Sequence, residues 1–438
     1  MAAALLLLAL VGAACSEGSG DDDTTSAGTD AATDTTTAAS ADSVVAQFAG
    51  EEWFMGTVPA TPVAADEDAE PIRIGIINQE NSPAGSFPEV RAAAEATVAF
   101  INAELGGVDG RPLELLTCAA DFAPETSQAC AQDLVNQGVI AFLGGLDVGS
   151  TGSIPVLEQN EIPVVGGIPV NLADMRSPIA FYFSGGTPGA FSAFAAYAIR
   201  ELGAERIAVA YGEFESFEHS ATTWGADVAT ELGAEVELIP FPILGTDFLP
   251  VLTKAADFDA DAIIVGAADT ACVPLMETRR DLEIEATLLL VGACAAPEIL
   301  DQAGAAAEGV IFNSEGPFDE NREAEIFAAA TERYATEPAG GAGTVSFRGA
   351  MNLWAALTEV AQDEGSDAIT SAAILEYMRA TRDQPSFWGH PYTCDGKQMS
   401  DLIALCAPQQ YLFEIGPEGT PAAAPNGFVD VTEFADSE

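Results

Sequence analysis

The chain has 438 residues, with 15 Lys or Arg against 68 Asp or Glu, and its formal net charge is −53. A chain this acidic repels phosphate backbones and anionic lipid headgroups, which excludes nucleic-acid binding through a basic face. Hydrophobic residues make up 48% of the sequence, too many for a wholly disordered protein, and the length allows two or three domains. With only two histidines, no multi-histidine metal site is expected.

The N-terminus has the pattern of an export signal. Residues 2–14 are apolar or small, and their hydrophobic run is too short to span a bilayer. Gly12, Ala13, Ala14 and Cys15 resemble a lipobox, which implies a lipid attached to Cys15. Gly12 stands where Leu is commoner and no Lys or Arg precedes the run, so an ordinary signal peptide with an incidental cysteine is the alternative. We expect a signal peptide over residues 1–15 and an anchor on the outer face of the cell membrane.

Residues 16–70 are predicted to be a disordered, acidic tether between the anchor and a folded body. The segment begins with Ser, Gly, Asp, Thr and Ala, which cannot bury enough apolar area to fold. Trp53, Phe54 and Met55 form an apolar island within it, and we expect this island to pack on the body. No later segment has the length and composition of a membrane span.

The cysteines beyond Cys15 are even in number, which in an exported chain indicates disulfide bonds. They fall into three local pairs along the sequence, namely Cys118 with Cys130, Cys272 with Cys294, and Cys394 with Cys406. We expect each cysteine to bond to its neighbour, although other connectivities are possible. A zinc site or a catalytic thiol is disfavoured, because the chain has no Cys-x-x-Cys and almost no histidine.

From residue 72 onward, apolar runs alternate with segments of helical periodicity. In the first unit the predicted strands are 72–77, 113–117, 139–143 and 162–165, and the predicted helices are 89–105, 124–137 and 151–159. This alternation is typical of a parallel sheet covered on both faces.

Residues 180–183 form a predicted strand that leads out of this unit, and the pattern then restarts. The second unit has predicted helices at 190–202, 217–232, 248–256 and 271–281, and predicted strands at 207–211, 235–240, 262–265, 287–291 and 310–313. Three further helices are expected at 320–335, 345–362 and 368–381, followed by a strand-like tail at 402–415. The sequence therefore predicts two similar α/β units in series.

In open parallel sheets, ligands bind beyond the carboxyl ends of the strands. The loops expected there come from both units and comprise residues 78–87, 144–150, 166–170, 212–217, 267–270 and 292–296. Two units with facing loops can form a cleft that closes around a small molecule by hinge bending.

Three passages resemble the type I periplasmic binding proteins, the leucine/isoleucine/valine-binding type of ABC transporter receptor. The first is IRIGIINQENSPAGS with FINAELGGVDGRPLEL, in which Asn102, Gly106, Gly107 and Gly110 match the family's asparagine and glycine signature. The second is GVIAFLGG followed by PVLEQNEIPVVGG. The third is LGAERIAVAYGEFESF with TELGAEVE and DFDADAIIVGAAD. The resemblance covers about residue 71 to the C-terminus.

The resemblance implies an α/β fold of two doubly wound parallel-sheet lobes joined by a multi-strand hinge. The first lobe would comprise residues 71–185 and 315–385, and the second would comprise residues 186–314 and 386–438. In such proteins, hydroxyl groups and backbone N–H groups of the first lobe hold the ligand's carboxylate.

The positions that match this site are only partly conventional. Asp147 stands at the usual serine position, where it would repel a carboxylate, and Ser150 and Thr151 follow it. Gly167 and Ile168 match the second loop and are expected to offer backbone donors.

Four more residues are expected to contact the ligand. Gln79 and Asn81 lie in the first loop, and Phe217 fits the aromatic position of the second lobe, although a role in that lobe's core is the alternative. Asp269 is the candidate for an acidic contact, because the family's acidic position falls near Cys294 and Ala295. The identity of the ligand is therefore open, and a neutral or cationic small molecule is a further candidate.

The expected function is that of a monomeric, lipid-anchored solute-binding protein, which presents an amino acid or similar small polar molecule to an ABC permease. A sensory module of the same fold is one alternative, and an enzyme of the doubly wound class is another. The sequence has no dinucleotide or phosphate-binding glycine motif and no Gly-x-Ser-x-Gly, so no catalytic residue and no cofactor are expected.

Overall fold

The computed structural model describes residues 43–82, 85–317, 321–362 and 365–435, all within one compact unit that spans residues 39–438. The predicted signal peptide, Cys15 and the start of the predicted tether lie outside the described residues.

The first sheet has five parallel strands in the order β4-β3-β5-β6-β7. Its strands are β3 (Ile72–Gln79), β4 (Leu113–Ala120), β5 (Ala141–Leu143), β6 (Val164–Val165) and β7 (Ala180–Phe181). The strands are apolar because helices cover both faces of the sheet, which leaves Ile74 and Ile76 of β3 almost fully buried. The predicted strands of the first unit are confirmed.

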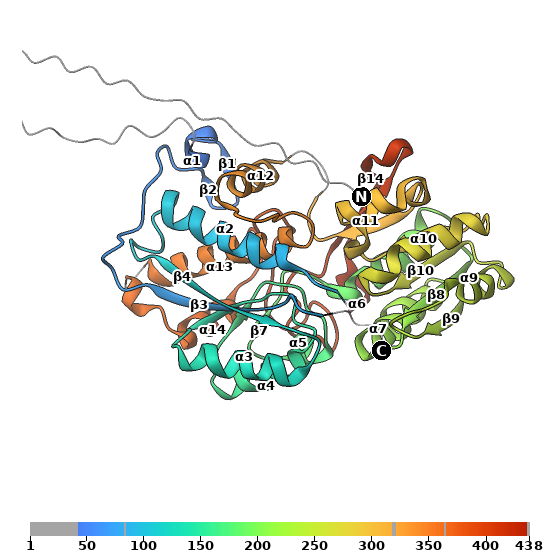
Figure 1. Cartoon of the computed structure of the whole chain (residues 1–438), viewed down its shortest axis with the longest axis horizontal. Helices are drawn as coiled ribbons and strands as arrows, with labels where there is room; N and C mark the ends of the chain where they lie inside the picture. The colour runs from blue at the N-terminus through green and yellow to red at the C-terminus, as the bar shows by residue number, and fades with distance from the viewer. Residues whose placement is uncertain (1–42, 83–84, 318–320, 363–364, 436–438) are drawn as a thin grey trace, which may run out of the picture. The chain divides into compact units, whose positions relative to one another are not determined.

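Helices pack on the two faces of the first sheet (Figure 1). One face carries α2 (Pro88–Glu104) and α13 (Gly343–Ala361), and the opposite face carries α3 (Pro124–Asn136) and α4 (Ser150–Gln159). The C-terminal helices α12 (Arg322–Tyr334) and α14 (Ser371–Ala380) pack against α2 and α13 respectively. The short α5 (Leu172–Arg176) contacts α4.

The second sheet repeats the strand order of the first and then extends it. Its order is β14-β13-β12-β11-β10-β8-β9, in which β8 to β12 are parallel and the last two strands are antiparallel. The bounds are β8 (Arg206–Gly212), β9 (Glu235–Phe241), β10 (Ala262–Gly266), β11 (Thr287–Leu290), β12 (Ile311–Ser314), β13 (Gln410–Ile415) and β14 (Pro421–Val429). The strand-like tail predicted at 402–415 is thus a strand only from residue 410.

Helices cover the second sheet as well. One face carries α6 (Gly186–Arg200) and a long helix made of α7 (Glu215–His219), a π-helical stretch (Ser220–Asp227) and α8 (Val228–Glu231). The helices α9 (Phe248–Asp257), α10 (Cys272–Asp281) and α11 (Pro297–Ala303) lie along the other. The sequence predicts the long helix but not its π-helical middle.

The chain passes between the two sheets after β7, after β12 and before β13, and these connections lie against one another. The hydroxyl of Ser184 donates to the Glu315 carboxylate over 2.9 Å. The backbone of Tyr182 exchanges hydrogen bonds with Ala404 and Cys406, both over 2.8 Å. These contacts form the expected multi-strand hinge.

The predicted tether and lobe boundaries differ from the structure at two places. Residues 43–70 are packed rather than disordered: α1 (Val44–Gln47) is followed by a hairpin of β1 (Glu52–Trp53) and β2 (Gly56–Thr57). Trp53 lies 6.0 Å from the Trp354 ring, so the apolar island does pack on the body. Residues 386–405, predicted for the second lobe, contact both sheets: Phe387 lies 5.5 Å from Phe347 and Tyr392 lies 4.6 Å from Phe183, while His390 lies 5.6 Å from Phe428 of β14.

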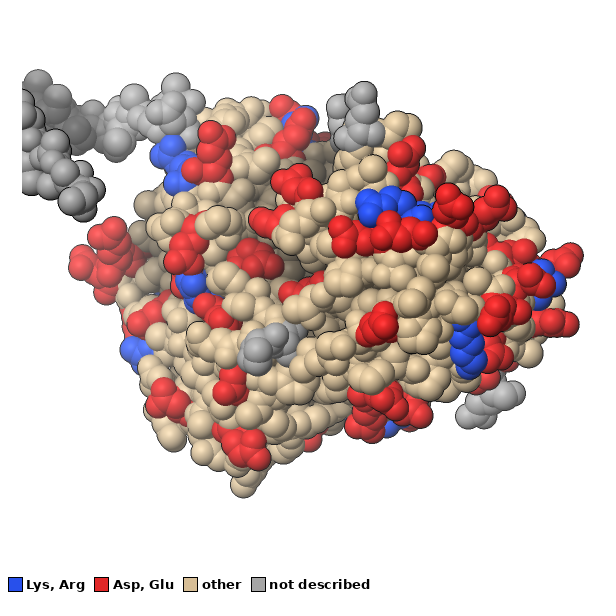
Figure 2. Space-filling model, turned by 45° about the vertical axis from the view of Figure 1, so that its right-hand side comes forward, with Lys and Arg blue, Asp and Glu red and all other residues tan. Residues whose placement is uncertain are grey.

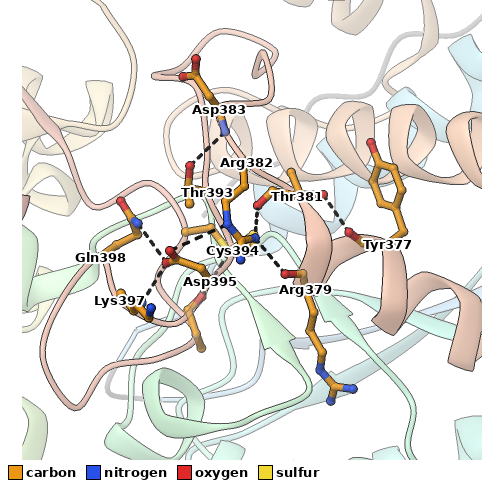
Figure 3. The surroundings of a disulfide bond; sticks show 12 residues. Tyr377, Arg379, Thr381, Arg382, Asp383, Thr393, Cys394, Asp395, Lys397 and Gln398 are labelled. Atoms are coloured by element: carbon orange, nitrogen blue, oxygen red, sulfur yellow. Dashed lines mark hydrogen bonds and ion pairs between the residues drawn. A yellow bond between two sulfur atoms is a disulfide. The ribbon is translucent and has the colours of Figure 1, made fainter.

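All three expected disulfide bonds are present. Cys118–Cys130 links β4 to α3, and Cys272–Cys294 links the start of α10 to the loop after β11. Cys394–Cys406 closes the loop that returns to the hinge (Figure 3). Around it, the Cys394 N–H donates to Thr381 O over 3.2 Å, and the Asp383 N–H donates to the Thr393 hydroxyl over 2.9 Å.

The asparagine and glycine signature builds the turn between α2 and β4. The Asn102 side chain donates to Leu113 O and accepts from Leu113 N–H, each over 2.8 Å, and so holds the start of β4. Gly107 has φ 65°, and a Cβ there would lie 2.1 Å from Arg111 O, so only glycine fits.

Among the described residues, none of the helices combines the length and the hydrophobicity that a membrane span requires.

Candidate functional site

The strand order places a topological switch point in each sheet, between β3 and β5 in the first and between β8 and β10 in the second. Loops that follow the carboxyl ends of these two sheets meet. Phe122, after β4, lies 6.3 Å from Phe214, after β8. A Cβ on Gly85, after β3, would lie 3.0 Å from Asp269 Oδ1, after β10. The candidate site therefore contains residues of both sheets.

Gln79 ends β3 at the first switch point and is 1% exposed. Its Nε2 donates to Gly85 O over 2.8 Å, while no described residue donates to its Oε1. Asn81, two residues later, is exposed, and its backbone N–H donates to Ala120 O over 3.4 Å. Of these two expected ligand contacts, Gln79 is buried and Asn81 is exposed.

The Asp147 carboxylate is occupied by hydrogen bonds from its own loop and from helices α3 and α4, which pack on the first sheet. It accepts from the hydroxyls of Ser127 and Ser153, over 2.6 and 2.7 Å, and from Gly149 N–H over 3.1 Å. Burial raises the pKa of this carboxyl despite these three donors. The geometry gives Asp147 internal partners in place of a ligand.

Ser150 belongs to the same buried network. Its hydroxyl accepts from the Asn171 side chain over 2.7 Å. Asp174, which caps the same turn, accepts from the N–H groups of Val170 and Asn171 over 2.9 and 2.8 Å. Burial raises the pKa of Asp174 to about 7, although the surrounding donors act in the opposite direction. A cavity of about 30 Å³ lies among these residues, which is room for a water molecule but not for an amino acid.

The remaining first-sheet positions have structural contacts or point outward. The Ile168 N–H, expected as a free donor, donates to Gly145 O over 3.0 Å. Gly167 packs so closely on Gly144 that a Cβ would lie 2.2 Å from its carbonyl carbon. Thr151 is exposed on α4. The expected carboxylate clamp is therefore not assembled from these residues in this conformation.

Phe217 lies at the second switch point and is half-buried. Its ring is 5.9 Å from Phe214, and it also approaches Gly266 at the end of β10. Phe217 thus packs on the strand end and on the aromatic pair that joins the two sheets, a position that combines the two roles considered from the sequence. The neighbouring Ser216 hydroxyl is buried and has no partner among the described residues.

Asp269 faces an acidic group that the sequence did not single out. Glu89, in the first turn of α2, is half-buried, and its pKa is raised by burial and by the charges of Glu298, Asp269 and Glu80. Burial also raises the pKa of Asp269. The only sequence signal for Glu89 was an acid in a helix's first turn, which is common for helix-dipole reasons alone. Figure 2 shows acidic side chains gathered in and around a hollow on one face.

The group is not a metal centre. Within the part of the chain that the structure describes, no three His, Cys, Asp or Glu side chains converge closely enough to hold a metal ion.

The model of the periplasmic binding protein family matches residues 71–405, which is most of the chain. The chain belongs to the periplasmic binding protein family. The match begins one residue before β3 and ends one residue before Cys406, so it includes the first sheet and all parallel strands of the second. No curated protein sequence matches this periplasmic binding protein.

Solved structures share its fold at low sequence identity. The leucine binding protein LivK from Thermotoga maritima is 20% identical with a TM-score of 0.66, covering 81% of this chain and 98% of its own. A fatty acid ABC transporter substrate-binding protein from Thermomonospora curvata is 16% identical with a TM-score of 0.69, and the match covers 86% of this chain and 97% of that protein. An R. palustris solute binding protein in complex with benzoate is 14% identical with a TM-score of 0.65, and the match covers 82% of this chain and 96% of that protein.

Proposed function

We propose that this periplasmic binding protein is the solute receptor of an ABC importer, which holds an amino acid or similar small polar molecule between the two sheets. The observation that carries the proposal is the meeting of loops from two sheets of the same strand order, beside their switch points. Ligands of doubly wound sheets bind at such points. Similar structures include a leucine binding protein, a solute binding protein in complex with benzoate and a fatty acid ABC transporter substrate-binding protein, so the fold is compatible with several solute classes.

Within this proposal, the contacts are Gln79, Asn81, Phe217 and Asp269, supplied by the ends of β3, β8 and β10. Gln79 provides a buried carbonyl oxygen without a donor, and Phe217 provides an apolar wall. Asp147 and Ser150 do not contact the solute in this proposal but stabilise the loop after β5 through their hydrogen bonds. Gly167 and Ile168 pack against the same loop and fix its shape.

Function as a receptor needs no bond to be made or broken. Solute affinity would arise from convergent polar groups and an apolar wall, and closure of the two sheets would exclude water. The closed form would then dock to a membrane permease outside the cytoplasm, held near it by a lipid on Cys15.

A thermal-denaturation screen tests the proposal. Amino acids, amides, polyamines and small organic acids are added in turn to the purified protein, and the melting temperature is followed. A solute that binds only the native state raises the melting temperature in proportion to the logarithm of its concentration above Kd. At least one class is expected to do so with a stoichiometry of one per chain, and to be recovered chemically unchanged. No stabilising solute in any class, or recovery of a converted product, contradicts the proposal.

The anchor is tested separately by fractionation of cells that express the whole chain. Wild-type protein is expected with the membrane, and Cys15→Ser protein in the soluble extracytoplasmic fraction. Equal distribution of the two proteins contradicts lipidation at Cys15 without bearing on solute binding.

A further inference from the structure

We infer that the solute is an organic cation that carries N–H donors, such as a primary ammonium or a guanidinium group, and that it binds between Gln79, Glu89 and Asp269. This inference rests on the proposed receptor function and narrows its substrate class. It depends on two separate observations, an uncompensated acidic group and a buried acceptor that lacks a donor.

The first observation is the charge at the meeting point of the two sheets. Glu89 extends from α2 of the first sheet, Asp269 follows β10 of the second, and Glu298 lies in the first turn of α11. No ion pair involves any of the three within the described parts of the chain. Burial of unpaired carboxylates is costly, so the site gains free energy when a cation enters.

The cationic side chain on the same helix as Glu89, Arg91, is already paired. Arg91, two residues along α2 from Glu89, contacts Glu80 over 3.0 Å, Glu95 over 3.0 Å and Glu337 over 2.7 Å. Its guanidinium therefore neutralises Glu80, which is the fourth carboxylate that affects Glu89, and leaves the charge of Glu89 and Asp269 unbalanced.

The second observation is the unpartnered Oε1 of Gln79. The side chain is 1% exposed and its Nε2 donates to Gly85 O over 2.8 Å, and a Cβ on Gly85 would in turn lie 3.0 Å from Asp269 Oδ1. Gly85 therefore lies between Gln79 and Asp269. A buried carbonyl oxygen without a donor destabilises the solute-free protein, and an incoming N–H removes this cost. A cation without N–H groups would satisfy the carboxylates but not this oxygen.

Carboxylate-bearing solutes are disfavoured by the same geometry. The hydroxyls of Ser127 and Ser153 are engaged by Asp147, and the Ile168 N–H by Gly145 O. These groups would have to give up existing partners to bind a solute carboxylate, which would also lie near Asp269 and Glu89. A metal ion is disfavoured because the carboxylates do not converge to ligand distance among the described residues.

Calorimetric titration of the wild-type protein with agmatine and putrescine tests the inference. Tetramethylammonium serves as a cation without donors, and leucine and benzoate serve as carboxylates. Agmatine or putrescine is expected to bind at least tenfold more tightly than the other three. Glu89→Gln and Asp269→Asn should each weaken that binding at least tenfold, while Glu376→Gln on α14 and Asp257→Asn on α9, which are exposed and remove the same charge, should change it less than twofold.

Two readouts guard against misfolding of the variants. Without solute, the melting temperatures of the Glu89→Gln and Asp269→Asn proteins should equal or exceed that of wild type, because each variant removes a repelled, half-buried charge. Binding of agmatine to the wild type should weaken as the pH is lowered and Glu89 and Asp269, whose pKa values are raised by burial, gain protons.

The possible results separate this inference from the proposed function. Tight binding of leucine or benzoate that survives both substitutions overturns the cationic class and leaves the receptor function in place. Tighter binding of tetramethylammonium than of agmatine overturns the role of Gln79 as an acceptor. If no solute of any class binds, the receptor function fails and this inference fails with it.

Discussion

Burial shifts the pKa values of several single carboxyl groups in this protein. Asp174 is the clearest case, because burial raises its pKa to about 7 even though it accepts hydrogen bonds from Val170 and Asn171 N–H groups. In the unfolded chain the same carboxyl has its ordinary value near 3.8. The native state therefore binds a proton more tightly than the unfolded state, and stability falls as the pH rises from about 4 to about 7.

Asp174→Asn removes this titration and keeps an oxygen for both backbone donors. Above pH 7 the variant should be more stable than wild type by roughly 1–4 kcal/mol, and the gain should vanish below pH 4. Urea unfolding at a series of pH values measures the difference between the two proteins. A difference that stays constant across the series contradicts the assigned pKa.

At the residue scale, the sequence pointed to Gln79 and Asp269 as candidate contacts but gave no sign of their relation to Glu89. Each of the first two follows a strand, where polar residues indicate a site. Glu89 begins a helix, where an acid is expected without any ligand. Asp147 and Ser150 also follow a strand, but Ser127 and Asn171, from distant parts of the chain, engage them, and no local pattern reveals that.

At the scale of elements, burial decides what the sequence reveals. Parallel strands covered on both faces appear as apolar runs, so each predicted strand from residue 72 to 313 has its counterpart. The edge strand β14 contains Pro421, Pro425 and Gly427, which the pattern marks as a turn-rich tail, yet edge strands tolerate proline because one side needs no ladder.

The attachment of residues 43–45 could not be predicted from the sequence, because a side chain far along the chain holds them. Glu104, at the end of α2, accepts from the Ser43 hydroxyl and the N–H groups of Val44 and Val45, and from the Tyr334 hydroxyl. Burial opposes ionisation of Glu104, but these donors outweigh it and lower its pKa. A segment that reads as polar linker is thereby fixed to the body.

Glu104→Gln tests this attachment. Glutamine has one acceptor oxygen, and its NH2 group would face donors that now bind the second carboxylate oxygen. The variant should therefore lose about 2–4 kcal/mol in free energy of unfolding. Limited proteolysis should also cut residues 43–58 faster. Glu95→Gln on the same helix, which breaks only a partly exposed ion pair with Arg91, should cost less than about 1 kcal/mol. Equal losses in the two variants would show that Glu104 has no special role.

At the scale of the whole molecule, a receptor that closes around its solute needs contacts between the two sheets that stabilise the closed form. Phe122 and Phe214 make such a contact, and Phe122 is 40% exposed even so. An aromatic pair of this kind contributes about 0.5–1.5 kcal/mol. Its loss should weaken solute binding without removing any contact to the solute.

Phe122→Ala should accordingly weaken solute affinity about 2–10-fold in calorimetric titration, with little change in the melting temperature of the solute-free protein. Phe428→Ala is the matched control, because Phe428 is similarly exposed but lies on the edge strand β14. Unchanged affinity in the Phe122 variant would mean that the pair does not stabilise the closed form.

Small-angle X-ray scattering of the protein, with and without a saturating solute from the screen, tests whether the two sheets close around the solute. The radius of gyration is expected to decrease when solute is added, because the two sheets close on it, and removal of the solute should reverse the change. A scattering profile that stays the same, while calorimetry shows the solute bound, contradicts a receptor that works by closure.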